Sequence, residues 1–306
     1  MFGGSSSDTA TVSNDGKLSA REEVVLMGPQ VVNRGTIHAH DVTLAAANGA
    51  ALKLNGSKFA VELGQTARKA LAANSGTITA NGGHVKLITA TTGALLSAVI
   101  QNTGAIEATK AASGQGGNVI LGSEVEGRVS AGGRITADSI KISTDVSNSS
   151  DSYTDWRMAQ FSSSGPAVRD VTVESGARLK ADEVIQITAL DSKVNSYGQI
   201  DGGDVRIEAF GGPVTVGNRI TGRNVYVQGN GIAINAPVQA TYDVTVQADP
   251  WNYYGTSLWQ NANVQSAQGN VSLSGKDVTQ GLFTKTSAAG DVTIQASAKG
   301  GQANVT

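Results

Sequence analysis

The sequence predicts an all-β protein, a right-handed parallel β-helix (solenoid) in which about 20 residues and three short strands form each coil. Three observations support this prediction. Short runs of alternating apolar and polar residues recur along the chain, Gly, Asn, Pro or Asp separates the runs, and the recurrence keeps a constant length. Alternation with a period of two places the branched residues on one face of a strand. The turn residues between strands force a corner rather than a helix.

Residues 205–248 show the repeat most clearly. Each cycle holds three alternating runs before the first run returns, and the next cycle keeps the same order. The runs are Val205-Arg-Ile207, Val214-Thr-Val216 and Ile220-Thr-Gly222, then Val225-Tyr-Val227, Ile232-Ala-Ile234 and Val238-Gln-Ala240, then Val244-Thr-Val246.

The first half of the chain repeats a different phrase, Asn-x-Gly-x-Ile-x-Ala, followed each time by a Val-x-Leu strand. The phrase begins at Asn33, Asn74 and Asn102, and the strands begin at Val42, Val85 and Val119.

One branched residue, the first of the Val-x-Leu strand or of its equivalent, recurs once in each coil, and we name it the anchor. We expect the anchors to stack in one interior column about 4.8 Å apart. This spacing gives roughly eleven coils and a rod about 50 Å long. The expected anchors are Val24, Val42, Val61, Val85, Val119, Ile140, Ile185, Val205, Val225, Val244, Val271 and Val292. The residues that follow them should face outward: Thr43, Lys86, Ile120, Lys141, Gln186, Arg206, Tyr226, Thr245, Ser272 and Thr293.

Composition agrees with a fold of short strands and tight corners. The 306 residues include 38 Gly and no Cys, 5% are aromatic, 16% are charged, and the formal net charge is −2. Because a solenoid core has no size limit, this length fits one continuous fold. The charge argues against nucleic-acid binding, and the lack of Cys excludes disulfides and thiolate metal sites. No stretch reaches the roughly 18 apolar residues of a membrane span.

Candidates for catalysis are sparse. His38 and His40 alternate on one strand, but Asp41 is expected on the other face, so a zinc ion lacks a third ligand. Asp201 and Asp204 lie on either side of two Gly. Two carboxylates suit acid–base chemistry, whereas Asp beside Gly also forms corners, which is the interpretation that we favour. We therefore expect no catalytic residue, no metal and no cofactor.

Aromatic residues concentrate in two expected insertions, near 146–167 and 249–261, which hold all three Trp of the chain. Planar side chains give a large contact area at low entropic cost, so they suit a platform for sugar rings or for a protein partner. The alternative is a lid folded over the coils. Both insertions follow an anchor strand, so we expect them at one edge, four coils or about 19 Å apart. The candidate binding residues are Tyr153, Trp156, Phe161, Trp251, Tyr253, Tyr254 and Trp259.

Four phrases of the first 125 residues, taken in order, resemble the secretion domain of two-partner-secreted exoproteins of the filamentous haemagglutinin type. They run from Leu26 to Ala39, from Val42 to Ala47, from Ala72 to Leu87 and from Gly93 to Gly104. The resemblance covers residues 18–125, and residues 126–306 are similar to the downstream β-helical repeats of that family.

This resemblance implies a structural or adhesive shaft of a large secreted bacterial surface protein, without enzymatic activity, that mediates attachment or displays a distal domain. It implies export through a two-partner outer-membrane transporter barrel and a glycan or protein receptor on a host or neighbouring cell. Residues 1–17 are polar and lack the features of a secretory signal, and the repeat continues to the last residue, so we expect a piece of a longer protein. The alternative is a β-helical carbohydrate-active enzyme, a polysaccharide lyase or a tailspike-type hydrolase.

Overall fold

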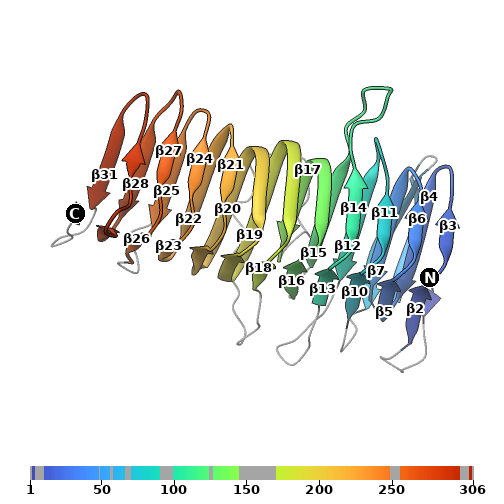
Figure 1. Ribbon diagram of the computed structural model, residues 1–306. Helices are drawn as coiled ribbons and strands as arrows, with labels where there is room; N and C mark the ends of the chain where they lie inside the picture. Colours follow the sequence, from blue (N-terminus) through green and yellow to red (C-terminus); the bar gives the residue numbers. More distant parts are fainter. Residues whose placement is uncertain are drawn as a thin grey trace.

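The computed structural model describes residues 2–3, 10–47, 49–55, 58–65, 70–89, 99–123, 127–144, 170–248, 256–296 and 303–304, with the backbone alone in 2–3, 49–55, 58–65 and 303–304. Every regular element in these residues is a β-strand. Figure 1 shows the strands stacked in a row, with the N-terminal strands at one end and the C-terminal strands at the other. The protein is an all-β solenoid, as the alternating runs predicted.

The strands of the coils follow one pairing rule: each pairs in parallel with its equivalent in the next coil. The first two coils contain β2 (Thr11–Asn14) with β5 (Gln30–Asn33), β3 (Lys17–Ser19) with β6 (Thr36–His38), and β4 (Glu23–Gly28) with β7 (Asp41–Ala46). Each coil therefore contributes a strand to each of three walls, which we name sheets A, B and C in chain order.

The three sheets extend along the whole row. Three long strands, β17 (Arg134–Ser143), β19 (Arg178–Ser196) and β20 (Gln199–Val216), bend from one sheet into the next and join the walls. Sheet A also contains β10 (Leu71–Asn74), β13 (Val99–Asn102), β16 (Arg128–Ala131), β18 (Val171–Val173), β23 (Ile232–Ile234), β26 (Leu258–Gln260), β29 (Val278–Gln280) and β32 (Ala303–Asn304). Sheet B also contains β11 (Thr77–Thr79), β14 (Ala105–Ala108), β21 (Ile220–Gly222), β24 (Val238–Ala240), β27 (Val264–Ser266) and β30 (Thr286–Ser287). Sheet C also contains β12 (His84–Thr89), β15 (Asn118–Ser123), β22 (Asn224–Gly229), β25 (Val244–Ala248), β28 (Val271–Gly275) and β31 (Val292–Ala296).

The anchors form a continuous interior column in sheet C, with one exception. Each pairs directly with the anchor of the next coil, and most are fully buried because the alternation turns their branched side chains inward. In order, the column is Val24, Val42, Val85, Val119, Ile140, Ile185, Val205, Val225, Val244, Val271 and Val292.

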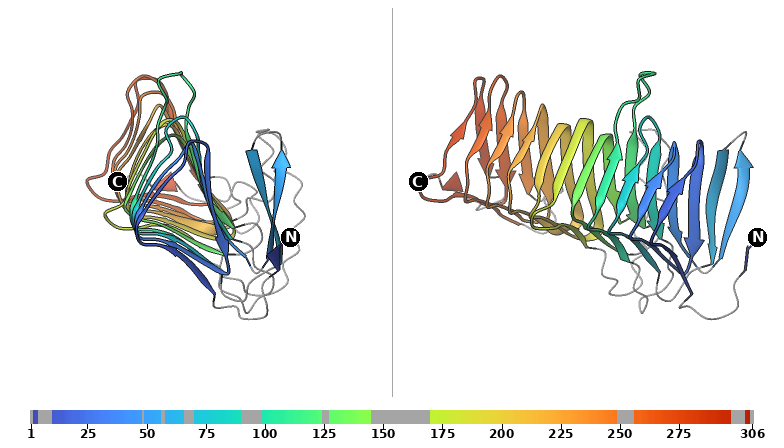
Figure 2. Two further views of the ribbon diagram at one scale, coloured as in Figure 1. Left: turned by 90° about the vertical axis from the view of Figure 1, so that its right-hand side faces the viewer. Right: turned by 45° about the vertical axis from the view of Figure 1, so that its right-hand side comes forward.

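Val61 is the exception, and its prediction as an anchor was wrong. It lies in β9 (Lys58–Gln65), which pairs antiparallel with β8 (Gly49–Asn55), and β8 pairs in turn with β1 (Phe2–Gly3). Figure 2 shows this hairpin beside the coils and outside their walls. The physical reason is local, since two runs that lie next to each other in the sequence, with Asn55 paired with Lys58, satisfy each other's backbone before any coil is needed.

The solenoid begins within residues 1–17, which we expected to be a polar lead-in before the first coil. Val12 in β2 pairs with Val31, and Leu18 in β3 pairs with Ile37, so both strands extend the inward columns by one coil. The surrounding Ser, Asn and Asp residues fill outward positions and corners.

A buried column of asparagine side chains holds the corner between sheets A and B in the first four coils. The Asn14 Nδ2 donates to Asn33 Oδ1, Asn33 Nδ2 to Asn74 Oδ1, and Asn74 Nδ2 to Asn102 Oδ1, each at 2.8 Å. The Gly of the same phrase is required because a Cβ at Gly76 would lie 2.0 Å from the carbonyl oxygen of the Gly one coil below. The repeated Asn-x-Gly phrase is thus a corner that satisfies its own polar groups.

Candidate functional site

Most of the candidate aromatic residues, Tyr153, Trp156, Phe161, Trp251, Tyr253 and Tyr254, lie outside the described residues. The strands that precede the two aromatic segments are described, however. Ile142 and Val246 occupy one column, linked through the anchor strands of the coils between them. Four pairing steps separate them, about 19 Å at the usual strand spacing. The chain thus enters both segments from the same position of the coil.

Trp259 is described, and it is part of the solenoid wall rather than of an insertion. Its neighbours Leu258 and Gln260 are buried, and all three residues form β26, paired with β23 on one side and β29 on the other. The expected insertion at 249–261 therefore extended too far. The alternation of Leu258-Trp259-Gln260 matches that of the strand below, which turns the indole outward and leaves it 48% exposed.

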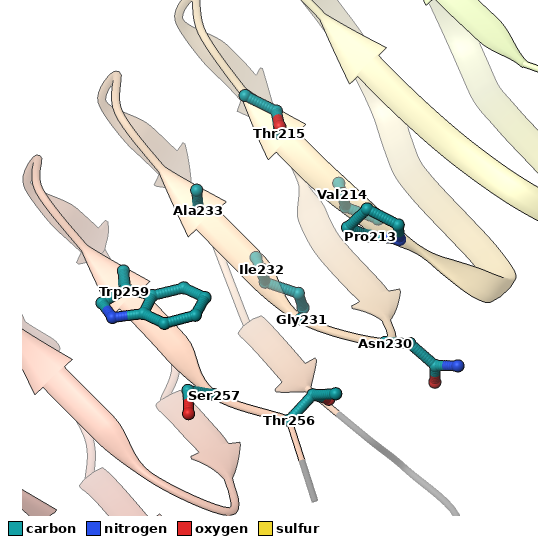
Figure 3. Close-up of a pocket in the computed structure, with 10 residues that line it drawn as sticks. All are labelled: Pro213, Val214, Thr215, Asn230, Gly231, Ile232, Ala233, Thr256, Ser257 and Trp259. Carbon is teal, nitrogen blue, oxygen red and sulfur yellow. The ribbon is translucent and has the colours of Figure 1, made fainter. Parts of the chain in front are cut away.

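Trp259 borders a shallow groove of about 370 Å³ on the outer surface of sheet A, near the small end of the range for small-molecule sites, about 300–1,000 Å³. Figure 3 shows the groove between three neighbouring strands, β20, β23 and β26. We name it the Trp259 groove. None of the described residues that line it has an ionisable side chain: Pro213, Val214, Thr215, Asn230, Gly231, Ile232, Ala233, Thr256, Ser257 and Trp259.

The outer surface of sheet C contains the mixed column that the sequence predicted, with the same members in register: Thr43, Lys86, Ile120, Lys141, Gln186, Arg206, Tyr226, Thr245, Ser272 and Thr293. A second outward column, which the sequence prediction did not include, lies two residues further along each strand. It includes Thr188, Glu208 and Gln228.

The two outward columns meet in a compact polar cluster of Arg206, Glu208, Tyr226 and Gln228, which we name the Arg206 cluster. The Arg206 Nη2 lies 2.6 Å from Glu208 Oε1, and the guanidinium carbon lies 4.7 Å from the centre of the Tyr226 ring. The Tyr226 hydroxyl donates a hydrogen bond to Gln228 Oε1. Glu208 is only 2% exposed although its position faces outward.

The electrostatics of the Arg206 cluster favour a neutral tyrosine. Burial raises the pKa of the Tyr226 phenol, the Glu208 carboxylate raises it further, and the Arg206 guanidinium partly lowers it. The Arg206 guanidinium neutralises the buried Glu208 carboxylate in an ion pair, and the Tyr226 phenol keeps its proton. Paired carboxylates at the spacing of a glycosidase are not present among these four residues.

The other candidates for chemistry have structural roles. Asp201 Oδ1 accepts from Thr221 Oγ1 at 2.9 Å, and Asp204 Oδ1 accepts from Asn224 Nδ2 at 3.0 Å, so both join neighbouring coils at corners. A Cβ at Gly203 would lie 2.2 Å from a carbonyl oxygen of the coil below, which explains the Gly between the two Asp.

Asp41 does not point away from the histidines as expected. Its Oδ1 lies 3.2 Å from His40 Nδ1 and accepts a hydrogen bond from the His84 backbone amide at 2.9 Å. Within the described residues, no group of three or more His, Cys, Asp or Glu side chains is placed to hold a metal ion. These contacts link two coils at a corner, the same role as that of Asp204.

No known protein-family model matches the chain, and no curated protein matches its sequence. The fold and the two outer-surface features therefore define only a class, a parallel β-solenoid with a half-exposed indole in an uncharged groove. Among the described residues, no helix has the length and hydropathy of a membrane span.

Proposed function

We propose that this chain is a non-enzymatic structural and adhesive shaft of a large secreted bacterial surface protein, which mediates attachment or displays a distal domain. In this proposal the solenoid is a right-handed parallel β-helix of about eleven coils, and its length of about 50 Å follows from the strand spacing. A two-partner outer-membrane transporter barrel exports it, and its receptor is a glycan or protein on a host or neighbouring cell. Export and cell-surface location come from the sequence resemblance.

The observation that supports this proposal best is the Trp259 groove. An indole that is 48% exposed lies in the middle of a strand whose outward neighbours in the adjacent coils are small, Ala233 and Thr279. Trp is enriched at contact surfaces, because its ring offers a large apolar area and its N–H a hydrogen-bond donor. A rigid rod that carries such a surface suits attachment at a distance from the cell.

Adhesion of protein-coated beads tests the proposal. Beads that carry the chain are expected to attach to cultured epithelial cells or to neighbouring bacteria several-fold more than albumin-coated beads. The double substitution Trp251→Ala with Trp259→Ala is expected to abolish attachment and leave the melting temperature nearly unchanged. Attachment at the albumin level would refute the adhesive function. A sharp fall in melting temperature would show instead that the aromatic side chains form a structural lid.

One observation favours the alternative of a carbohydrate-active enzyme, namely a buried acid beside Arg and Tyr on the outer surface of sheet C. The Arg206 cluster has charge and hydrogen-bonding groups within one small area. We propose that it is structural, because its carboxylate is neutralised and it lacks a second acid. The purified chain is expected to release no reducing or unsaturated sugar from neutral or acidic polysaccharides, with or without calcium. Release that Glu208→Gln, Asp201→Ala or Asp204→Ala abolishes would establish the enzyme.

A further inference from the structure

We propose that the Trp259 groove binds one pyranose ring of an uncharged glycan, with the sugar stacked on the indole. The inference rests on the proposed adhesive function and names the ligand class for that site. Three features of the groove support it: its shape, its lack of charge and the hydrogen-bonding groups at its rim.

The shape follows from the register of three coils. Thr215, Ala233 and Trp259 are outward-facing partners on successive strands, so about 10 Å, two strand spacings, separates the first from the last. Ala233, in the middle, has only a methyl group, and the indole extends from β26 towards β23 (Figure 3). The result is a trough about one strand wide with an aromatic wall.

Gly231 keeps one end of the trough open. Its φ of +90° lies in the left-handed region that favours glycine, and a Cβ there would have its nearest neighbour only at 3.9 Å. The turn therefore brings backbone, rather than a side chain, to the groove. A flat ring is able to approach the indole across Ala233 and Gly231 without displacing any side chain.

The charge distribution favours an uncharged ligand. Among the groove residues that the structure describes, none has an ionisable side chain. Ser257 Oγ donates to Asp277 Oδ2 at 3.3 Å, so the acidic side chain of Asp277 lies next to the rim of the groove. An anionic sugar would gain no cationic partner from the lining and would be repelled by this carboxylate. The aromatic face attracts the weakly positive C–H face of a neutral pyranose.

The rim supplies the polar groups that orient a sugar. Thr215 and Ser257 present hydroxyls, which both donate and accept, as sugar hydroxyls do. Asn230 also lines the groove, but its Oδ1 is buried, so the orienting groups are the two hydroxyls. A half-exposed aromatic wall with hydroxyls around it fits a sugar better than the apolar anchor residue of a protein partner, which buries in a dry pocket.

Binding to a panel of uncharged hexose and N-acetylhexosamine oligosaccharides, with sulfated and sialylated counterparts, tests the inference. The full chain is expected to bind at least one uncharged oligosaccharide and to bind its charged counterparts more weakly. Trp259→Ala is expected to weaken binding by about tenfold or more, and Trp259→Phe by less, because part of the aromatic face remains. Ala233→Leu is expected to weaken binding similarly, because it fills the trough and keeps the indole.

Tyr242 provides a matched control, since its side chain is also 48% exposed but lies at a corner outside the groove. Tyr242→Ala is expected to leave binding unchanged, and all four variants are expected to melt near the wild-type temperature. Equal losses in the Tyr242 and Trp259 variants would overturn the inference, as would binding of the charged sugars alone. Unweakened binding by Ala233→Leu would overturn the groove as the binding site even if Trp259→Ala proved unstable.

The adhesion assay separates the two proposals. Beads that attach to cells equally well before and after enzymatic deglycosylation, with no oligosaccharide bound in the panel, would retain the adhesive function and refute the glycan. Absence of both attachment and oligosaccharide binding would refute both. Attachment that deglycosylation abolishes, together with panel binding that depends on Trp259, would establish both.

Discussion

Single residues matter in this protein according to the direction in which their side chains face. The same residue type has opposite roles at inward and outward positions. Asn74 is buried and its side chain links two further asparagines, whereas Asn261 is exposed and its side chain donates to Asn235, although the hydrogen-bond length is 2.8 Å in both cases. Burial, rather than hydrogen-bond length, should therefore decide how much each bond contributes to the free energy of unfolding.

We predict that Asn74→Ala lowers the free energy of unfolding by about 2 kcal/mol or more, because it removes the donor of the buried Asn102 Oδ1 and one of two acceptors of the buried Asn33 amide. Asn261→Ala, the matched exposed variant, is expected to change it by less than about 0.5 kcal/mol. Urea unfolding followed by circular dichroism measures both. Equal losses in the two variants would contradict the role assigned to burial.

Tyr226 gives a prediction for alkaline pH. Its pKa in the folded protein is raised above the ordinary value of 10.0, so the folded state holds the phenolic proton more tightly than the unfolded state. The resulting stabilisation is complete below the unfolded pKa and is lost as the pH rises through the folded pKa.

Wild-type protein should therefore lose stability relative to Tyr226→Phe as the pH rises above about 10. The comparison needs urea unfolding of both proteins at pH 8, 9, 10 and 11, because other groups titrate equally in the two. A stability difference that stays constant over this range would show that the phenol does not ionise differently in the two states.

Among the elements of the described residues, the hairpin of β8 and β9 interrupts the repeat. The coil closes without it. The Ala47 amide donates to the Gly28 carbonyl at 3.0 Å, and the Leu71 amide donates to the adjacent Pro29 carbonyl at 3.3 Å. The chain thus leaves and re-enters the wall above two consecutive residues of the coil below. The hairpin is an addition to a complete coil.

Deletion of residues 48–69, which joins Ala47 to Ala70, is expected to yield a folded protein. The new link between β7 and β10 would have two residues, the same length as the natural link of Asn230 and Gly231 between β22 and β23. The deletion removes no member of the small apolar cluster on the outer surface of sheet C, to which Met27 and Ile120 belong. Circular dichroism should retain the β signal with one cooperative transition. A broad or absent transition would show that the hairpin is needed for folding.

At the scale of the whole molecule, stability should depend on the position of a coil in the row. In a solenoid each coil contacts only its neighbours, so an interior coil has two interfaces and a terminal coil has fewer. The anchor column shows the difference directly. Val225 is 1% exposed between two neighbouring anchors, whereas Val292, the last anchor of the column in the described residues, is 44% exposed.

We therefore predict that Val225→Ala lowers the free energy of unfolding by about 2 kcal/mol, through lost burial and a cavity, and that Val292→Ala lowers it by less than about 0.5 kcal/mol. The two substitutions are chemically identical and occupy one register. Urea unfolding of both variants measures the difference. Equal losses would contradict nearest-neighbour stability in this chain.

The strand periodicity, the inward column and the outward column of sheet C could be predicted from the sequence, because each depends on alternation within one short strand. The sequence also selected Trp259 as a candidate. Which residues surround that indole depends on how the coils stack, since Ala233 and Thr215 lie 26 and 44 residues before Trp259 in the sequence. Glu208 likewise became part of a cluster through its place beside Arg206 and Tyr226. Val61 shows the limit of pattern reasoning, because the same alternation fits a coil strand and a hairpin strand. The partner that a strand finds in space, not its own residues, decides between them.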